Sequence, residues 1–161
     1  MKFLFLFIIS LFSISAFAQA IKKPANNNTV KITPVTKFKP PVVKTLLGRN
    51  EKEATVTAEE ANQLVNLPLK IVDDKNITYT ISSYQFLYKK KSVVEDEESG
   101  RRSTVFTNTA SLFRETPLPK VWKENISGAL QRDEQLYFFD IIVIDKQGRK
   151  FFAPDVKIIV K

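Results

Sequence analysis

An almost unbroken apolar run near the C-terminus predicts the central strand of the fold. Residues Tyr137–Ile144 are nearly all apolar, which is typical of a strand buried on both faces. Lys146–Arg149 then predicts a turn, because its glycine can adopt a positive φ. Apolar and polar positions alternate again from Val156 to Lys161, and Pro154 before them predicts a strand break or an edge. The pattern therefore predicts a C-terminal β-hairpin.

Two further strands are predicted upstream, and the second contains an irregularity. Leu69–Val72 is short and β-rich, and it stops at the turn-forming cluster Asp73–Asn76. Apolar and polar positions alternate in Ile77–Ile81, but after Ser82–Ser83 the phase shifts, so that the aromatic residues of Tyr84–Tyr88 share one face. A shift by one residue within a continuous strand is what a β-bulge produces.

Two short helices are predicted between the strands. Thr57–Glu60 has the capping-box sequence T-x-x-E, in which the Thr hydroxyl and the Glu side chain each bind a free backbone amide. Pro119 suits a first helical turn, and Trp122, Ile126 and Leu130 recur at a spacing of four, as one apolar helix face does.

These elements predict a mainly β fold, namely an immunoglobulin-like antiparallel β-sandwich with two short helices. We divide the chain into a signal peptide (1–18), a basic linker rich in proline and asparagine (19–53), and the β-sandwich domain (54–161). The domain has about 108 residues, a common size for a single core. Within the linker, Val42–Leu47 is apolar enough to add a strand to an edge of the domain.

The N-terminus has the three parts of a secretory signal peptide. Met1-Lys2 supplies a positive charge, Phe3–Phe12 an apolar core, and Ala16-Phe17-Ala18 a cleavage site of small residues. The apolar run is shorter than the roughly 20 residues that span a bilayer, so we expect cleavage after Ala18 or Ala20 rather than a retained anchor. No cysteine is present for a lipid anchor. We therefore expect an exported chain without stable membrane insertion.

Net positive charge belongs to the linker and not to the domain. Residues 19–50 contain no acidic residue and seven basic ones, which gives +7: Lys22, Lys23, Lys31, Lys37, Lys39, Lys44 and Arg49. From residue 51 onward, 17 basic and 17 acidic residues give zero. The high proline and asparagine content predicts disordered or extended chain. The segment could be a solvated linker or an arm for anionic surfaces. We favour the linker, and we expect no nucleic-acid partner because Phe38 is the segment's one aromatic residue.

Composition excludes many enzyme classes. The chain has no Cys and no His, so it can build neither a Cys-His or Ser-His-Asp nucleophile nor a Cys/His zinc site, and it can form no disulfide. Its four scattered glycines match no phosphate-binding loop. We therefore expect no enzyme activity, no cofactor, and no catalytic, cofactor-binding or metal-binding residue.

Three groups of residues are nevertheless candidates for chemistry. Consecutive acids in Glu95–Glu98 lack the alternate spacing of a calcium loop, so a solvated hairpin tip with partly paired charges is the favoured interpretation. Asp140 lies within an apolar strand and could be a shifted carboxyl, although a structural carboxylate bound by a nearby amide or Lys is favoured. Trp122 with Tyr84 or Tyr88 could stack on a sugar, but the helical spacing favours a core position for Trp122.

The C-terminal stretch resembles a known envelope family. Glu134–Ile141, Lys146–Arg149 and Ala153-Pro154 are similar to the C-terminal domain family of GldM, the periplasmic shaft protein of gliding motility and type 9 secretion, and Ile81–Phe86 resembles its earlier strand. The resemblance covers roughly Lys70 to Lys161. Lys146-Gln147 stand before the turn glycine where the family has a Pro-Asp-Gly-like sequence. The shaft proteins also have a transmembrane helix and tandem domains, so their motor role is not implied.

What the resemblance implies is an immunoglobulin-like envelope domain used for protein–protein contact. We therefore expect an exported, periplasmic or cell-surface protein that binds another envelope protein, by strand addition at an open sheet edge or by an apolar patch. A homodimer is left open. Two alternatives are a carbohydrate-binding module or His-free glycan-acting protein, and a binder of anionic surfaces through the basic segment.

Overall fold

The computed structural model describes residues 37–161, and residues 38–161 of these belong to one compact unit. The predicted signal peptide and the linker up to residue 36 lie outside the described residues. Within the described part, no helix has both the length and the hydropathy needed to cross a membrane.

The described chain folds mainly into strands, with two short helices, as predicted. In chain order the elements are β1 (Val43–Leu47), β2 (Asn50–Glu51), β3 (Glu53–Val56), α1 (Ala58–Leu64), β4 (Leu69–Asp73), β5 (Thr78–Glu95), β6 (Arg102–Phe113), α2 (Lys120–Ile126), β7 (Gln135–Ile144), β8 (Lys150–Ala153) and β9 (Val156–Val160). The strand at 69–72, the capped helix after Thr57 and the C-terminal hairpin with Pro154 outside its strands are all confirmed.

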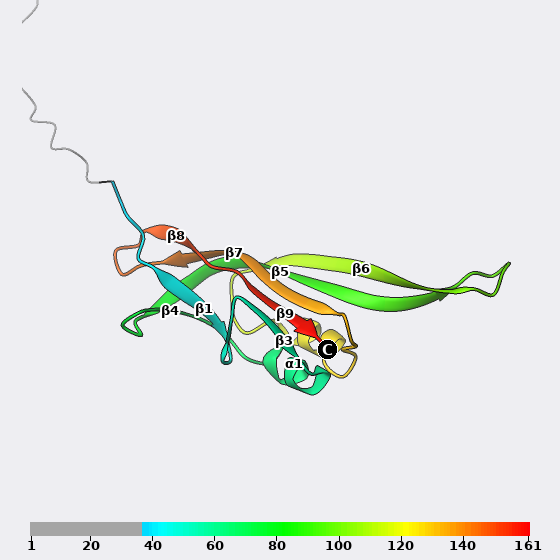
Figure 1. Cartoon of the computed structure of the whole chain (residues 1–161). Coiled ribbons are helices and arrows are strands. Elements are labelled where there is room, and N and C mark those ends of the chain that lie inside the picture. The colour runs from blue at the N-terminus through cyan, green and yellow to red at the C-terminus, as the bar shows by residue number, and fades with distance from the viewer. Residues whose placement is uncertain (1–36) are drawn as a thin grey trace, which may run out of the picture. The chain divides into compact units, whose positions relative to one another are not determined.

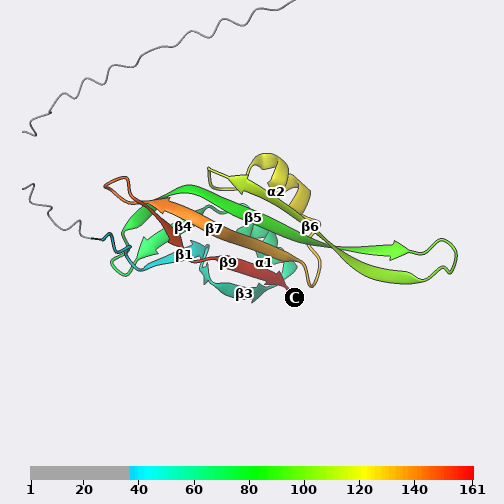
Figure 2. The same cartoon turned by 90° about the horizontal axis from the view of Figure 1, so that it is seen from above.

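The strands form one sheet that folds over into a sandwich-like arrangement. Its order is β2-β1-β4-β5-β7-β9-β3, with β6 on β5 and β8 on β7. Only two residue pairs join β4 to β5, and beyond them β1 and β4 turn away from β5, so that β1 lies against β9 and β2 beside β3. One pair, β3 with β9, is parallel, which departs from the predicted antiparallel arrangement. In Figure 1, β1, β4 and α1 lie below β5 and β7, and Figure 2 shows α2 beside β5 and β6.

Two bulges keep the core side chains of β5 and β7 on the same face. The predicted bulge at Ser82–Ser83 is confirmed, because Ile81 faces Val143 whereas Ser83 faces Ile142. A second bulge was not predicted. It inserts Asp140 into β7 with φ 48°, in the left-handed region where Asp is tolerated. The two irregularities together allow a long strand to follow the twist of the sheet without turning its apolar residues outward.

The core lies between the folded halves of the sheet and beneath the helices. Phe86 is fully buried, and its ring centroid lies 4.8 Å from that of Phe138 and 5.5 Å from that of Trp122. Trp122 also meets Phe113 edge-on at 5.6 Å, which confirms its predicted packing against the core. Helix α2 ends at Ile126, so Leu130 is buried in the following loop rather than on the predicted helical stripe.

The predicted linker is shorter than its assigned range of 19–53. Residues 43–51 form β1 and β2, and β1 lies inside the sheet between β2 and β4. Its residues alternate so that Val43, Thr45 and Leu47 are buried, which confirms the strand expected within 42–47 but places it between two strands rather than at an edge. Gly48 follows with φ 62°, and an added Cβ would lie 2.9 Å from a methyl group of Leu64. The domain therefore begins near Phe38.

The prediction that β7 is buried on both faces is wrong. Leu136, Phe138, Ile141 and Val143 are buried, whereas the residues between them are partly or fully exposed. The helices and the folded-over strands cover one face of β7, and no element of the described chain covers the other. We call the uncovered side the outer face.

A pair of phenylalanine variants tests this assignment of the core. We expect Phe86→Ala to lower the free energy of unfolding by about 3–5 kcal/mol, because it leaves a cavity among aromatic rings. Phe152→Ala is the matched control, since the Phe152 side chain is 70% exposed, and it should change stability by less than about 0.5 kcal/mol. Urea unfolding followed by tryptophan fluorescence measures both. Equal losses in the two variants would contradict the assignment.

Candidate interaction surface

A two-stranded ribbon extends beyond the body of the domain. The β5–β7 pairing ends at Lys89 opposite Gln135, whereas β5 and β6 stay paired as far as Glu95 and Arg102. Residues 90–107 therefore form a hairpin supported by no third strand of the described chain, and we call this segment the ribbon. Figures 1 and 2 both show it projecting well past the rest of the sheet.

The ribbon exposes apolar side chains on both of its faces. Val93, Val94, Val105 and Phe106 are 38–63% exposed. The Lys89 ammonium lies 4.4 Å from the centre of the Phe106 ring, a cation–π contact that covers part of one ring face. A two-stranded hairpin is marginally stable in water by itself, and exposed apolar groups of this kind mark contact sites. The composition of the ribbon is thus typical of an element that meets another molecule.

The predicted hairpin tip with paired charges is confirmed. Arg102 Nε donates to Glu95 Oε2 at 2.8 Å, and Asp96 Oδ1 accepts hydrogen bonds from the backbone and hydroxyl of Ser99, each at 2.7 Å. These bonds from Ser99 hold the pKa of Asp96 below its usual value. In residues 37–161 no group of three or more acidic side chains is placed to hold a metal ion. The tip is an ordered acidic turn.

A buried carboxylate fixes the ribbon where it leaves the body. Glu134, which directly precedes β7, is fully buried. Its Oε1 accepts a hydrogen bond from the backbone N–H of Lys91 at 2.8 Å. Its Oε2 accepts from the Tyr88 hydroxyl at 2.6 Å and from the Gln131 N–H at 3.1 Å. Three donors thus satisfy a group that would be costly to bury without partners.

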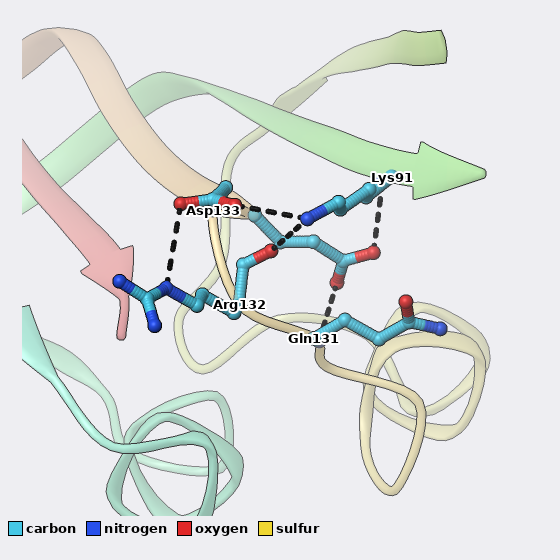
Figure 3. A network of polar contacts seen from close by, with 5 residues as sticks. Lys91, Gln131, Arg132 and Asp133 are labelled. Carbon is cyan, nitrogen blue, oxygen red and sulfur yellow. Dashed lines mark hydrogen bonds and ion pairs between the residues drawn. The ribbon is translucent and has the colours of Figure 1, made fainter. Parts of the chain in front are cut away.

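The Lys91 side chain makes a second attachment at the same place. Its ammonium donates to Asp133 Oδ2 at 2.9 Å and to the Arg132 carbonyl at 3.3 Å, and Figure 3 shows the three residues converging. The hydrogen bond from Lys91, with the charge behind it, lowers the pKa of Asp133. Burial and the bond to Glu134 raise the pKa of Tyr88, which keeps its hydroxyl a donor. We call Tyr88, Lys91, Asp133 and Glu134 the ribbon anchor.

The outer face of the sheet continues from the ribbon and mixes apolar with charged groups. Tyr137 and Phe139 stack on each other there, with ring centroids 4.9 Å apart and planes 13° from parallel. The Tyr137 hydroxyl donates to Asp155 Oδ2 at 2.6 Å, and this bond together with partial burial raises the pKa of Tyr137 to about 12. Leu87 and Lys89 lie beside Tyr137 and line a shallow open hollow with it.

The structure places the three candidate groups apart from one another, with Glu95–Glu98 at the ribbon tip, Asp140 at the β7 bulge and the aromatic residues in the core. Asp140 is exposed at the bulge and accepts a hydrogen bond from the Gln85 amide at 2.8 Å, in accord with a structural carboxylate. Tyr84 and Tyr88 are buried, with exposures of 0% and 6%, and Trp122 packs between Phe86 and Phe113. The favoured core position of Trp122 is therefore confirmed over the alternative in which these rings stack on a sugar.

Neither the ribbon nor its anchor is among the predicted sites. The charged residues mark the hairpin tip in the sequence. Apolar and polar residues do not alternate along β6, because neither face of this strand is buried in the ribbon. Residues 103–113 do carry one usable signal, a run of β-branched and small polar residues without charge, glycine or proline. Comparison with known proteins adds no assignment, since no family model and no curated protein matches the chain.

Variants of the anchor test its energetic role. In Glu134→Gln the side-chain amide can no longer accept hydrogen bonds from all three donors. We therefore expect the free energy of unfolding to fall by about 1–3 kcal/mol. The backbone amide of Lys91 should also exchange its hydrogen faster. Asp133→Asn is the control, because it removes an exposed ion pair and leaves the Glu134 bonds in place. Chemical denaturation and amide exchange by NMR measure these effects, and unchanged Lys91 exchange in Glu134→Gln would contradict the anchor.

The Asp133–Lys91 pair predicts a pH dependence of defined sign. Since the folded pKa of Asp133 lies below the unfolded value of 3.8, its contribution is present above about pH 4 and is lost as the pH falls through the folded pKa. The stability difference between the wild type and Asp133→Asn should therefore be largest near neutral pH and vanish in strong acid. Denaturation midpoints of both proteins between pH 7 and pH 2 measure this, and a difference that grows on acidification would be the opposite result.

Proposed function

We propose that this protein is an exported, non-enzymatic envelope protein that serves as a protein–protein interaction module, with the ribbon as its contact element. The single observation that carries the proposal is the ribbon itself, in which six residues of β5 and six of β6 extend past the third strand with apolar side chains in solvent. A domain gains little from ordering such an element unless a second macromolecule packs against it.

Further support comes from the sequence. The positively charged start, the apolar run Phe3–Phe12 and the A-x-A site support export, and periplasmic retention is the simplest destination. The similarity of the C-terminal hairpin to the GldM domain family supports an immunoglobulin-like domain of the gliding and type 9 secretion envelope. Phe139 and Leu87 on the outer face are available to extend a contact made by the ribbon.

The sequence-based alternatives have less support. Tyr137 and Phe139 are partly exposed, but they stack face to face, so one face of each ring is covered and the two rings do not form a coplanar platform for a sugar. Three of the seven basic residues that would bind anionic surfaces, Lys22, Lys23 and Lys31, lie outside the described residues, and that function stays a prediction. A contact made through the ribbon has a direct structural rationale in its exposed apolar residues.

Site-specific crosslinking tests the proposal. We expect a photo-reactive amino acid at Val94 of the ribbon to capture a defined envelope protein in cells, while the same group at Phe152 does not capture that protein. A shortened ribbon, in which Asn-Gly joins Ser92 directly to Val105, closes on a hydrogen-bonded pair, because the Lys91 N–H before it points outward to Glu134. This variant keeps the register of the remaining strands and should abolish co-purification of the captured protein. Co-purification that persists after shortening, or capture of the same protein from both positions, would reject the ribbon as the contact element.

A further inference from the structure

The outer edge of β6 is an open row of backbone donors and acceptors. β6 pairs with β5 along its whole length, from Arg102 opposite Glu95 to Phe113 opposite Tyr84, in one uninterrupted register. No other strand of residues 37–161 pairs with it. The edge is twelve residues long, which is about twice the length of a typical strand.

This edge lacks the features by which proteins usually prevent strand pairing. Those features are charged side chains, proline, bulges and short length. Residues 103–113 contain no charged residue, no proline and no glycine, and they are rich in threonine, valine and phenylalanine. The adjacent strand β5, by contrast, has three consecutive lysines at 89–91. The β6 edge is thus suited to accept a further strand.

We propose that the occupant of this edge is β6 of a second copy of the chain, paired antiparallel about a twofold axis near Phe106. The inference rests on the proposed function in taking the ribbon as a contact element, and it deepens that function by naming the partner of one edge. Antiparallel pairing of one strand with its own copy is isologous, so the interface uses both edges and closes as a dimer.

Complementary charges at the two ends of β6 favour a second copy of the chain in the antiparallel orientation. Glu97 and Glu98 at the tip are exposed, and Arg114, just past the other end of β6, is exposed as well; none of the three takes part in an ion pair among the described residues. In an antiparallel pair the acidic tip of each copy lies beside the Arg114 end of the other. A parallel pair would instead place the two acidic tips together, which is unfavourable.

The position of Phe106 fits the twofold axis. Phe106 lies near the middle of β6, and its side chain is 44% exposed with Lys89 over part of the ring. Pairing about this residue places the two Phe106 rings directly opposite each other, and cross-strand aromatic pairs stabilise antiparallel strands. It also places Arg102, the one charged residue of β6, opposite Ala110 of the other copy. Beyond the ends of the strand, the same register places Glu98 near Arg114 of the other copy and Glu97 near Glu115.

Cysteine crosslinking tests the geometry, and the natural absence of cysteine makes the experiment clean. In the chain beginning at Gln19, Phe106→Cys should form a disulfide-linked dimer on mild oxidation, because residues opposite each other across such an axis have Cα atoms close enough for a disulfide. Phe152→Cys, exposed on β8, is the matched control for random collision. Equal yields from the two variants, or no dimer from Phe106→Cys, would overturn the proposal.

A charge exchange tests the pairing without a covalent bond. Glu98→Lys and Arg114→Glu should each weaken the dimer by about tenfold at low salt, since each change acts twice by symmetry, and the double variant should restore it. Sedimentation equilibrium measures the dissociation constant. Single variants that leave it unchanged, or a double variant weaker than either single one, would contradict the antiparallel arrangement.

The outcomes also separate this inference from the proposed function. A monomer at all concentrations whose ribbon still captures an envelope protein would reject the second copy and leave the contact role intact. A monomer in which the outward-facing β6 amides, those not bonded to β5, are protected from exchange would assign the edge to the chain's own residues 19–36 and likewise reject the inference. A dimer that depends on Arg114, with no envelope protein captured at Val94, would support the pairing and limit the partner to the chain itself.

Discussion

The fold depends on one long strand that changes its partners along its length. β5 pairs with β4 at its start, with β7 and β6 along its middle, and with β6 alone at its end. Because side chains alternate strictly along a strand, an 18-residue strand can serve these three environments only if its phase is adjusted once. The bulge at Ser82–Ser83 makes that adjustment, and it aligns Tyr84, Phe86 and Tyr88 with the core.

The ribbon anchor at Glu134 supplies a hydrogen-bond partner for β5 at the point where β7 no longer pairs with it. Lys91 is the first β5 residue whose outward N–H would lack a partner after β7 stops, and a buried side-chain oxygen takes the place of the missing strand. The same carboxylate accepts from Tyr88, so it ties the last core residue of β5 to the first ribbon residues. The Glu134 side chain thus ends the hydrogen-bond ladder between β5 and β7 without leaving the Lys91 N–H unpaired.

Most of the body could be predicted from the sequence, because its elements have one buried face. Alternation revealed the β5 bulge, the capping box revealed α1, and the turn at Gly148 revealed the C-terminal hairpin. Features that do not change periodicity were not predictable in this way. The bulge at Asp140 depends on a single residue with positive φ, and the burial of Glu134 depends on partners 43 and 46 residues away in sequence.

The error about β7 has the same origin. An apolar run is compatible with burial on two faces or with one buried and one apolar open face, and periodicity cannot separate the two. Tyr137 and Phe139 belong to the open face. The boundary of the linker was misplaced because composition is averaged over many residues, whereas the strand Val43–Leu47 is specified by three alternate positions.

The ribbon also has a mechanical consequence. Since β5 runs without a break from the tip into the centre of the sheet, a force on the tip directed along the strand loads many backbone hydrogen bonds at once, in shear. A force across the strand is resisted first at Lys91, where two attachments act over a short distance from the pivot. The ribbon therefore resists a pull along its axis more strongly than a sideways force, and it bends about the attachment to Glu134.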